Sequence, residues 1–385
     1  MSLRIFHLSD LHIVLKLFNY DLREDQIHIF DQIVKAAEEK KPDAIIIAGD
    51  IYDKAVPSAE AVDVFDYFLS EIAKALPNTH IMMISGNHDS ASRINVFRKV
   101  LRRRNIHMIG IPPRMEDEYI EKVVLQDEYG DVNFYLLPFV KPSMVRNITG
   151  SDENGNSLSY NEAIHRLIER ENIDVEIRNV LVSHQFYLPQ GMKAEEVERS
   201  DYEVRTVGNI DSICGDVLEV FDYAALGHIH KPMKVGSDFY RYCGTPMQYS
   251  ISESGQTKGI IMVDFGPKGE ISTEVIELKP LRYVRSVRGE LEEVLMHPSD
   301  DFVSVVLTDK KDLDVIDMKD RLRQAFPYLL EIQRTGMRSV SYSKDFTEEK
   351  ELDMYELCSS FLDDLDDEEK KLLKDVINTV EGVRA

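Results

Sequence analysis

The sequence has few cysteines and no long apolar run. Its three cysteines, Cys214, Cys243 and Cys358, lie far apart and form no C-x-x-C pair, so neither a disulfide framework nor a thiolate metal site is expected. No run of about 18 apolar residues is present, so no transmembrane helix is expected either. The N-terminus lacks the basic and then apolar pattern of a secretory signal. These absences predict a cytoplasmic protein.

The chain otherwise has the composition of an ordinary folded protein, with 43% hydrophobic and 30% charged residues. Its net charge of −23 argues at first against a nucleic-acid ligand, because affinity for phosphates comes from clustered Lys and Arg. However, the stretch 345–381 is densely acidic, whereas Arg98, Lys99 and residues 102–104 form basic clusters. In addition, the formal net charge includes any carboxylates that bind cations, and bound cations would offset their negative charge. Net charge therefore does not exclude DNA.

Apolar strands and amphipathic helices alternate at the start of the chain. Periodicity predicts strands at 5–8, 44–48 and 80–84, and helices at 25–40 and 58–75. The buried face of the second helix is predicted to carry Val62, Phe65, Leu69, Ile72 and Leu76. The alternation predicts an α/β fold of layered mixed sheets flanked by helices.

From about residue 123 the pattern changes to hairpins, which are predicted to turn at 129–131 and 266–269. Additional strands are therefore expected to be added antiparallel, and short strands are predicted between the hairpins at 179–183 and 223–226.

Three domains are predicted. A composition break at Lys279-Pro280 ends a catalytic domain at 1–279 and begins a small α+β capping domain at 280–340. Residues 345–385 are predicted to form a helical pair that cannot bury both of its apolar stripes by itself. The pair either packs on its own chain or docks to a partner, and the sequence does not favour one over the other.

Five short polar clusters stand where strands are predicted to end, which is where layered α/β folds bind ligands. They are Asp10-Leu11-His12, Gly49-Asp50, Gly86-Asn87-His88-Asp89, His184 and Gly227-His228-Ile229-His230. An extended backbone would point Asp10 and His12 to the same side, and likewise His228 and His230. Glycines before Asp50, Asn87 and His228 are expected to permit tight turns.

Oxygen and imidazole ligands without thiolates suit Mn²⁺, Fe²⁺ or Zn²⁺. Two cations roughly 3.5–4 Å apart can both activate a water and neutralise charge in phosphodiester cleavage, and Asp50 is the candidate bridge between them. Each cluster alone is a weak signal, but five in this order are specific. The other six histidines have no such partners and are interpreted as structural: His7, His28, His80, His107, His165 and His297.

The clusters resemble those of the calcineurin-type metallophosphoesterase superfamily. The flanking sequence is similar to the SbcD-type nucleases, which repair and recombine DNA, over about the first 280 residues. The stretches that carry the likeness are LSDLH, AGDIYDKAVPS, SGNHDS, LVSHQF, YAALGHIHKP and YRYCGTPMQYSISE. One departure is Val14, where relatives usually place a glycine, and it bears on how closely a substrate backbone can approach that loop.

The resemblance implies two divalent metal ions, most often Mn²⁺, and assigns a role to each cluster. It implies that one ion is held by Asp10, His12, Asp50 and His230, and the other by Asp50, Asn87, His184 and His228. His88 would then be catalytic, donating to phosphate oxygens or protonating the leaving oxygen. Asp89 either orients His88 or only caps the next helix.

The resemblance also implies 3′-to-5′ exonuclease action on double-stranded DNA and endonuclease cleavage of single strands and hairpins. It implies a homodimer formed through helices of the catalytic domain, and an SbcC-type coiled-coil ATPase as partner, docked at 345–385. Two alternatives are a metallophosphoesterase for other esters and a DNA-end-binding scaffold of low activity. Purple acid phosphatases have Tyr where Asp53 stands, and protein phosphatases have Arg where Ser85 stands, which favours the nuclease.

Overall fold

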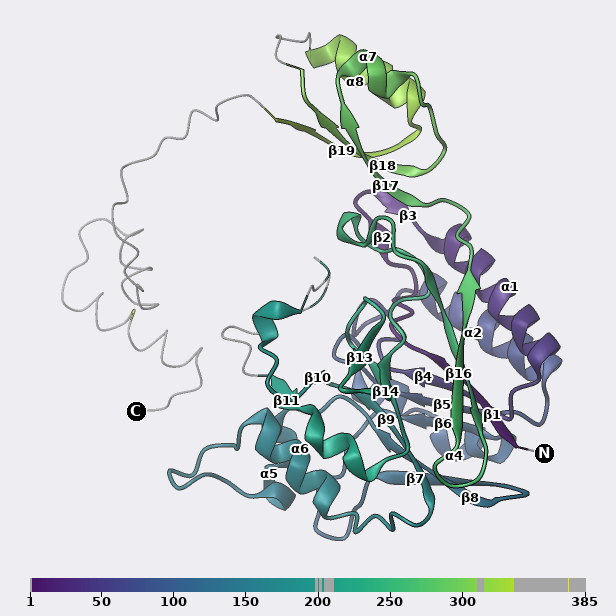
Figure 1. Cartoon of the computed structure of the whole chain (residues 1–385), viewed down its shortest axis with the longest axis vertical. Helices are drawn as coiled ribbons and strands as arrows, with labels where there is room; N and C mark the ends of the chain where they lie inside the picture. The colour runs from purple at the N-terminus through teal and green to yellow at the C-terminus, as the bar shows by residue number, and fades with distance from the viewer. Residues whose placement is uncertain are drawn as a thin grey trace. The chain divides into compact units, whose positions relative to one another are not determined.

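The computed structural model describes residues 2–197, 200, 203, 211–309, 315–335 and 373, and residues 1–335 form one compact unit (Figure 1). The predicted helical pair at 345–385 lies outside the described residues except for Leu373. The boundary at 279/280 stays a prediction. Among the described residues, no helix combines the length and apolar character needed to cross a membrane.

The first sheet has six strands in the order β16-β15-β1-β4-β5-β6. Its strands are β1 (Leu3–Leu8), β4 (Ala44–Ala48), β5 (His80–Ile84), β6 (Ile106–Ile109), β15 (Lys258–Phe265) and β16 (Ile271–Leu278). Strands β1, β4, β5 and β6 run parallel, while β15 joins β1 antiparallel. The predicted strands 44–48 and 80–84 are confirmed to the residue.

The second sheet also has six strands, in the order β13-β14-β12-β9-β8-β7. Its strands are β7 (Glu121–Asp127), β8 (Gly130–Leu137), β9 (Arg178–His184), β12 (Tyr223–Gly227), β13 (Met233–Val235) and β14 (Ser237–Tyr242). The two predicted hairpins are antiparallel as expected, because β7 pairs with β8 and β15 with β16 in this way, whereas β8, β9, β12 and β14 pair with one another in parallel. The parallel pairing of β8 with β9 fits the crossover between them, which contains helix α6 (Tyr160–Glu169), because parallel neighbours need such a long connection.

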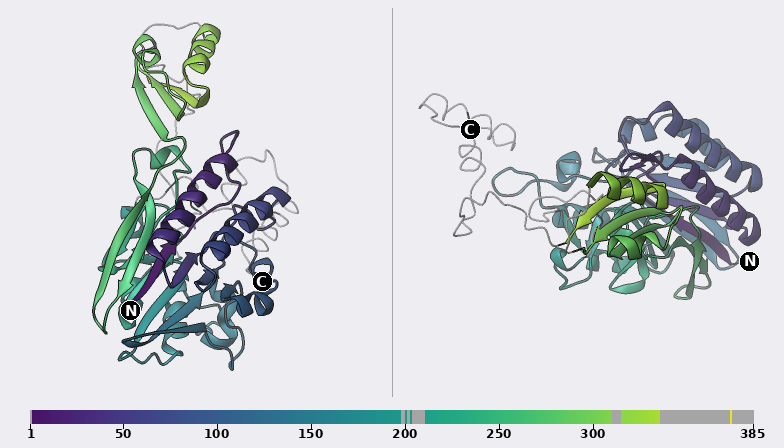
Figure 2. Two further views of the ribbon diagram at one scale, coloured as in Figure 1. Left: turned by 90° about the vertical axis from the view of Figure 1, so that its right-hand side faces the viewer. Right: turned by 90° about the horizontal axis from the view of Figure 1, so that it is seen from above.

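The two sheets pack face to face, and helices cover their outer faces. In β1, Leu3 and Ile5 point into the layer between the sheets, while Phe6 and Leu8 point toward the helices, as the period of two in a strand requires. The first sheet is covered by α1 (Arg23–Lys40) and α2 (Ala59–Ala75), which lie side by side (Figure 2). The second is covered by α5 (Pro142–Thr149) and α6 (Tyr160–Glu169). The predicted layered α/β fold is confirmed.

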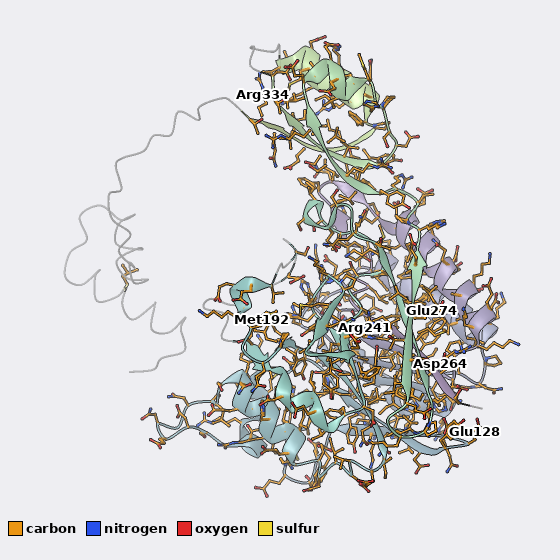
Figure 3. All side chains as sticks on the ribbon, in the orientation of Figure 1. Glu128, Met192, Arg241, Asp264, Glu274 and Arg334 are labelled. Atoms are coloured by element: carbon orange, nitrogen blue, oxygen red, sulfur yellow. The ribbon has the colours of Figure 1, made fainter. Side chains whose placement is uncertain are left out.

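The first hairpin turn differs from its prediction by about one residue. The first hairpin turns at Glu128 and Tyr129, since Asp127 already pairs with Gly130 (Figure 3). The predicted buried face of α2 is confirmed at Phe65 and Ile72, with Leu69 and Leu76 partly buried, but is wrong at Val62. In α2 the buried face consists of Ala61, Val64, Phe65, Phe68 and Ile72. Val62 is 46% exposed, because the face is rotated toward the aromatic contact between Phe68 and Phe30 of α1.

The remaining elements are short or belong to a small subdomain. The short ones are β2 (Lys16–Leu17), β3 (Tyr20–Asp21), β10 (Phe186–Leu188), β11 (Ser212–Cys214), α3 (Ala91–Ile94), α4 (Arg98–Leu101), and the 3-10 helices Arg102–Arg104, Ala194–Glu196, Gly215–Val220 and Ile251–Glu253. The subdomain is a parallel sheet of β17 (Val284–Gly289), β18 (Phe302–Leu307) and β19 (Tyr328–Arg334) with α7 (Leu291–Leu295) and α8 (Val315–Ala325).

A buried ion pair fastens the two sheets at the edge where β1 and β9 begin. Asp127 accepts hydrogen bonds from Arg178 Nη1 at 2.9 Å and from the backbone N–H of Leu3 at 2.9 Å. Both side chains of the pair are 4% exposed. This edge lies opposite the carboxyl ends of the same strands.

We expect Asp127→Ala to lower the free energy of unfolding by about 3–5 kcal/mol, because it leaves Arg178 buried and unpaired. Although burial favours protonation, hydrogen bonds from Arg178 hold the pKa of Asp127 below its usual value. The stabilisation is therefore present at neutral pH and lost as the pH falls below about 4. Urea unfolding at pH 7 and pH 3 measures both effects. If Asp127→Ala lowered the free energy of unfolding by the same amount at both pH values, the stabilisation by Asp127 would not be ionic.

Candidate metal centre

Every predicted site residue lies in a loop at the carboxyl end of a strand, and the loops of both sheets meet there. Strands β1, β4 and β5 of the first sheet are followed by the predicted clusters, and so is β12 of the second, while His184 ends β9. The side chains brought together are those of Asp10, His12, Asp50, Asn87, His88, His184, His228 and His230.

The loops reach this arrangement through left-handed backbone rather than extended backbone. The φ angles are 52° for Asp10, 40° for His12, 49° for Asp50 and 102° for His228. The expected extended geometry of the two His-containing motifs is therefore wrong. Such conformations cost free energy in non-glycine residues and collect at functional sites.

Hydrogen bonds across the loops hold this strained backbone. The N–H of Asp10 donates to Gly49 O and that of His12 donates to Asp50 O, both at 3.0 Å. The carboxylate of Asp10 in turn accepts the N–H of His228 at 3.1 Å. The loops of both sheets are thus tied to one another at the site.

The glycines before the ligands are needed mainly for close packing. Gly49 has a φ of 90°, as expected for a turn. A Cβ on Gly86 would lie 2.1 Å from Asp50 Oδ1, and one on Gly227 would lie 2.0 Å from Ala48 O. The prediction that all three glycines permit tight turns therefore holds for Gly49, whereas the other two leave room for the site itself.

The first group of ligands consists of Asp10, His12 and His230, whose ligand atoms lie within 4.8 Å of one another. The two Nε2 atoms of His12 and His230 face each other at 3.1 Å. Both side chains are 1% exposed. Two imidazole nitrogens pointed at one spot, beside a carboxylate, are the donor set of a transition-metal ion.

The second group consists of Asn87, His184 and His228 around Asp50. Asn87 Oδ1 lies 3.1 Å from His184 Nε2 and 2.9 Å from His228 Nδ1. Asp50 Oδ2 lies 3.2 Å from His184 Nε2 and 3.7 Å from His12 Nε2. One oxygen of Asp50 therefore faces both groups, while its Oδ1 accepts the N–H of His88 at 2.9 Å.

The electrostatics of the site fit bound cations. Burial raises the pKa of Asp10 to about 6, so nearby positive charge would favour its ionised form. Burial also lowers the pKa of His12 well below its usual value, which keeps its nitrogen available as a ligand. Although burial opposes it, the Asp50 carboxylate raises the pKa of His184 to about 9. A cation beside Asp50 would replace that proton.

Hydrogen bonds behind the ligands fix the imidazoles. His184 Nδ1 donates to Ala48 O at 2.7 Å, so its Nε2 carries the lone pair that a metal needs. His88 Nδ1 lies 3.1 Å from Asp53 O, which leaves its Nε2 for other contacts. His88 is half-buried and packs edge-on against His12 with ring centroids 4.9 Å apart.

Asp89 does not contact the His88 ring in the structure. Its carboxylate accepts the backbone N–H groups of Ile51, Tyr52 and Gly86 at 2.9–3.0 Å. It also makes no cap, since α3 has Ser90 at its N-cap without a side-chain hydrogen bond. Asp89 therefore joins the loops after β4 and β5, and neither of its two predicted roles matches these contacts.

Two supporting residues were missed in the sequence. Gln26 of α1 donates to Leu11 O and His12 O and accepts the N–H of Val14 at 2.8 Å, which holds this valine at a φ of 63°.

The second residue, Glu253, lies behind His230. Its side chain is 1% exposed and pairs with the buried Lys258 at 2.7 Å. Although burial opposes it, Lys258 holds the pKa of Glu253 well below its usual value. In the sequence, Glu253 was marked only by its place at the end of the family-like stretch YRYCGTPMQYSISE.

Metal affinity should depend on pH through Asp10. Because a proton competes with the cation for this carboxylate, we expect Mn²⁺ affinity to fall further as the pH drops through about 6, the pKa of Asp10. Calorimetric titration with Mn²⁺ between pH 5 and 8 measures it. A pH-independent affinity over this range would remove Asp10 from the ligands.

Comparison with known proteins identifies the family of the chain. The family model described as calcineurin-like phosphoesterase matches residues 3–232. Similar solved structures include TT1561 of Thermus thermophilus (13% identity, 71% of this chain and 99% of that one, TM-score 0.41). Others are GAP50, the anchor in the inner membrane complex of Plasmodium (12%, 87% and 98%, 0.42), and a dimetal phosphatase from Danio rerio (11%, 73% and 99%, 0.40).

The solved structures are too distant to bear on function, whereas the family model covers more than half of the chain. The matched range, residues 3–232, includes every candidate ligand described above. The chain therefore belongs to the calcineurin-like phosphoesterase family, hydrolases that cleave phosphoester bonds with divalent metal ions.

Proposed function

We propose that the protein is a two-metal DNA nuclease of the SbcD type, acting as a 3′-to-5′ exonuclease on duplex DNA and as an endonuclease on single strands and hairpins. The observation that carries the two-metal part is that one oxygen of Asp50 faces both ligand groups. The DNA part rests on the motifs flanking the ligands, including the stretch that ends at Glu253. Mn²⁺ is the proposed metal, with Fe²⁺ and Zn²⁺ as alternatives.

The chain's own groups have separate tasks in this reaction. Asp10, His12 and His230 would hold one ion, and Asn87, His184 and His228 the other, with Asp50 shared. When bound, the ions supply an activated water and neutralise charge on the phosphate. His88 donates from Nδ1 to Asp53 O. In the imidazolium form both ring nitrogens carry protons, and its Nε2 can then donate to a phosphate oxygen or protonate the leaving oxygen.

A cavity beside the centre supports an anionic substrate. It measures about 630 Å³ and is lined by Val14, Lys16, Asp53, Lys54 and Val56, among others. Its two lysines place positive charge next to the metal ligands of a chain whose net charge is −23. Val14 places a side chain in the cavity lining, where relatives usually have a glycine, and this narrows the approach of a substrate to the loop.

The proposed partners are a second copy of the chain and an SbcC-type ATPase. An exposed apolar patch around α3 and α4 supports the homodimer: Val96 is 49% exposed, Phe97 74% and Val100 64%. Contact with a second copy of the chain would remove these apolar side chains from water, which is favourable. The segment proposed for the ATPase, 345–385, lies outside the described residues apart from Leu373.

The catalytic role of His88 can be separated from metal binding. We expect His88→Ala to lower kcat on linear duplex DNA with Mn²⁺ by about 10²–10⁴-fold, while both metals stay bound in calorimetry. His297→Ala, a change at an exposed histidine of the subdomain, is the control and should leave cleavage unchanged. Wild-type cleavage by the His88 variant would remove it from the mechanism.

The same assay distinguishes the alternatives. End-labelled duplexes report the direction of digestion, and bis-p-nitrophenyl phosphate beside p-nitrophenyl phosphate reports diester against monoester preference. Cleavage of the monoester with intact DNA would favour a phosphatase. Binding of duplex ends without turnover of any ester would favour the scaffold.

The docking segment can be tested by truncation. We expect a chain that ends at Arg338 to cleave bis-p-nitrophenyl phosphate at the wild-type rate but to lose binding of the SbcC-type ATPase in analytical ultracentrifugation. The catalytic unit at 1–335 is compact without the removed residues. If the shortened chain still binds, the interface lies elsewhere.

A further inference from the structure

The ligand His230 has a second ring nitrogen whose surroundings are unusual. While Nε2 faces His12, Nδ1 is buried and has no hydrogen-bond partner in the described part of the chain. The acceptor facing it is Glu253 Oε1, at 3.6 Å. Metal-binding histidines commonly donate this second N–H to a carboxylate, which fixes the ring and raises its basicity as a ligand.

Glu253 is itself held rigidly. Its Oε2 accepts from Lys258 Nζ at 2.7 Å and from Thr245 Oγ1 at 3.0 Å. Its Oε1 accepts from Ser250 Oγ at 3.1 Å. Lys258 Nζ also donates to His230 O at 2.9 Å, so both the ring and the backbone of this ligand face one buried ion pair.

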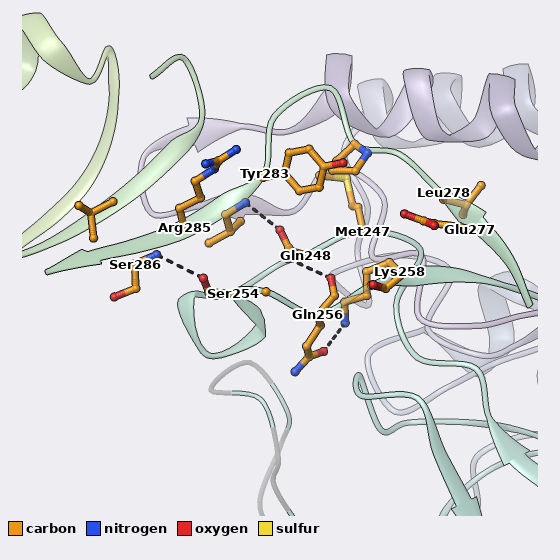
Figure 4. Close-up of a pocket in the computed structure, with 15 residues that line it drawn as sticks. Met247, Gln248, Ser254, Gln256, Lys258, Glu277, Leu278, Tyr283, Arg285 and Ser286 are labelled. Carbon is orange, nitrogen blue, oxygen red and sulfur yellow. Dashed lines mark hydrogen bonds between the residues drawn. The ribbon is translucent and has the colours of Figure 1, made fainter. Parts of the chain in front are cut away.

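The network continues to the subdomain through Gln248, which is 3% exposed. Its Nε2 donates to Glu253 O at 3.1 Å, and its Oε1 accepts the N–H of Val284, the first residue of β17, at 2.8 Å. Figure 4 shows Gln248 between the strand that carries Arg285 and the segment that carries Gln256 and Lys258. A cavity of about 450 Å³ adjoins this joint, so the side chains there are not packed solidly against β17.

We propose that Glu253 is a positioning residue for His230, and that Gln248 links its position to β17 of the subdomain. This inference rests on the proposed metal centre. Because Gln248 is hydrogen-bonded to both Val284 of β17 and the backbone of Glu253, a displacement of β17 would shift Glu253. The distance between the Glu253 carboxylate and His230 Nδ1 would then change. The subdomain thereby sets how well one of the two metal sites is formed.

Mn²⁺ titration by calorimetry, without substrate, tests the proposal. We expect Glu253→Gln to weaken one of the two sites by about 10–100-fold and leave the other unchanged. Gln248→Ala should weaken the same site by a smaller factor. Ser254→Ala is the matched control, because Ser254 Oγ also accepts a backbone N–H of the same strand, from Ser286 at 3.2 Å, and should have no effect.

A variant that combines Gln248→Ala with Glu253→Gln shows whether the two residues affect Mn²⁺ affinity through the same contact or independently. If Gln248 acts through Glu253, the double variant binds Mn²⁺ no more weakly than Glu253→Gln alone. Additive losses would overturn the link, and wild-type isotherms for both single variants would overturn the positioning role. Should Glu253→Gln not fold, as judged by its thermal melt, wild-type binding by Gln248→Ala would still overturn the link to β17. Absence of Mn²⁺ binding in the wild type would instead refute the metal centre itself.

Discussion

The structure depends on concentrating acidic and imidazole groups where the two sheets meet. Asp10, His12, Asp50, His184 and His230 are at most 2% exposed, and unpaired charges at such positions are costly. Burial raises the pKa of Asp10 to about 6 while the neighbouring Asp50 stays acidic beside His184. Two divalent cations would resolve this opposition, because they offset the carboxylates without requiring protons on the imidazoles.

The fold serves this centre by bringing loops from two sheets to one place. Strands β1, β4 and β5 deliver their ends from the first sheet, and β9 and β12 from the second. Left-handed residues such as Asp10 and Asp50 are costly to place there. Loop-to-loop hydrogen bonds and the three amide contacts of Asp89 offset that cost. An ion pair at the opposite edge, Asp127 with Arg178, fastens the same sheets where no ligand is involved.

The sequence predicted which polar side chains the fold brings together more accurately than it predicted the backbone geometry that orients them. Residue type and position after apolar runs identified Asp10, Asp50 and His184, because strands of buried apolar residues such as 44–48 are recognised by local pattern alone. The left-handed backbone and the parallel pairing of β9 with β12 arise from contacts between distant segments, which no local pattern contains. Glu253 escaped notice for the same reason, since its partners Lys258, Thr245 and His230 meet only in the folded chain.

The position of Glu253 also bears on why this chain carries a subdomain beyond the matched residues 3–232. Both Gln248 and Glu253 lie after that range, yet they contact His230 and β17. On the other side, Tyr20 of the β2–β3 hairpin, which follows the His12 loop, donates to Leu329 O in β19 at 3.1 Å. The subdomain therefore contacts the segments behind His12 and His230, the two histidines of the first candidate ligand group. A partner that moved it would act on one metal site and leave the other, formed by Asn87, His184 and His228, in place.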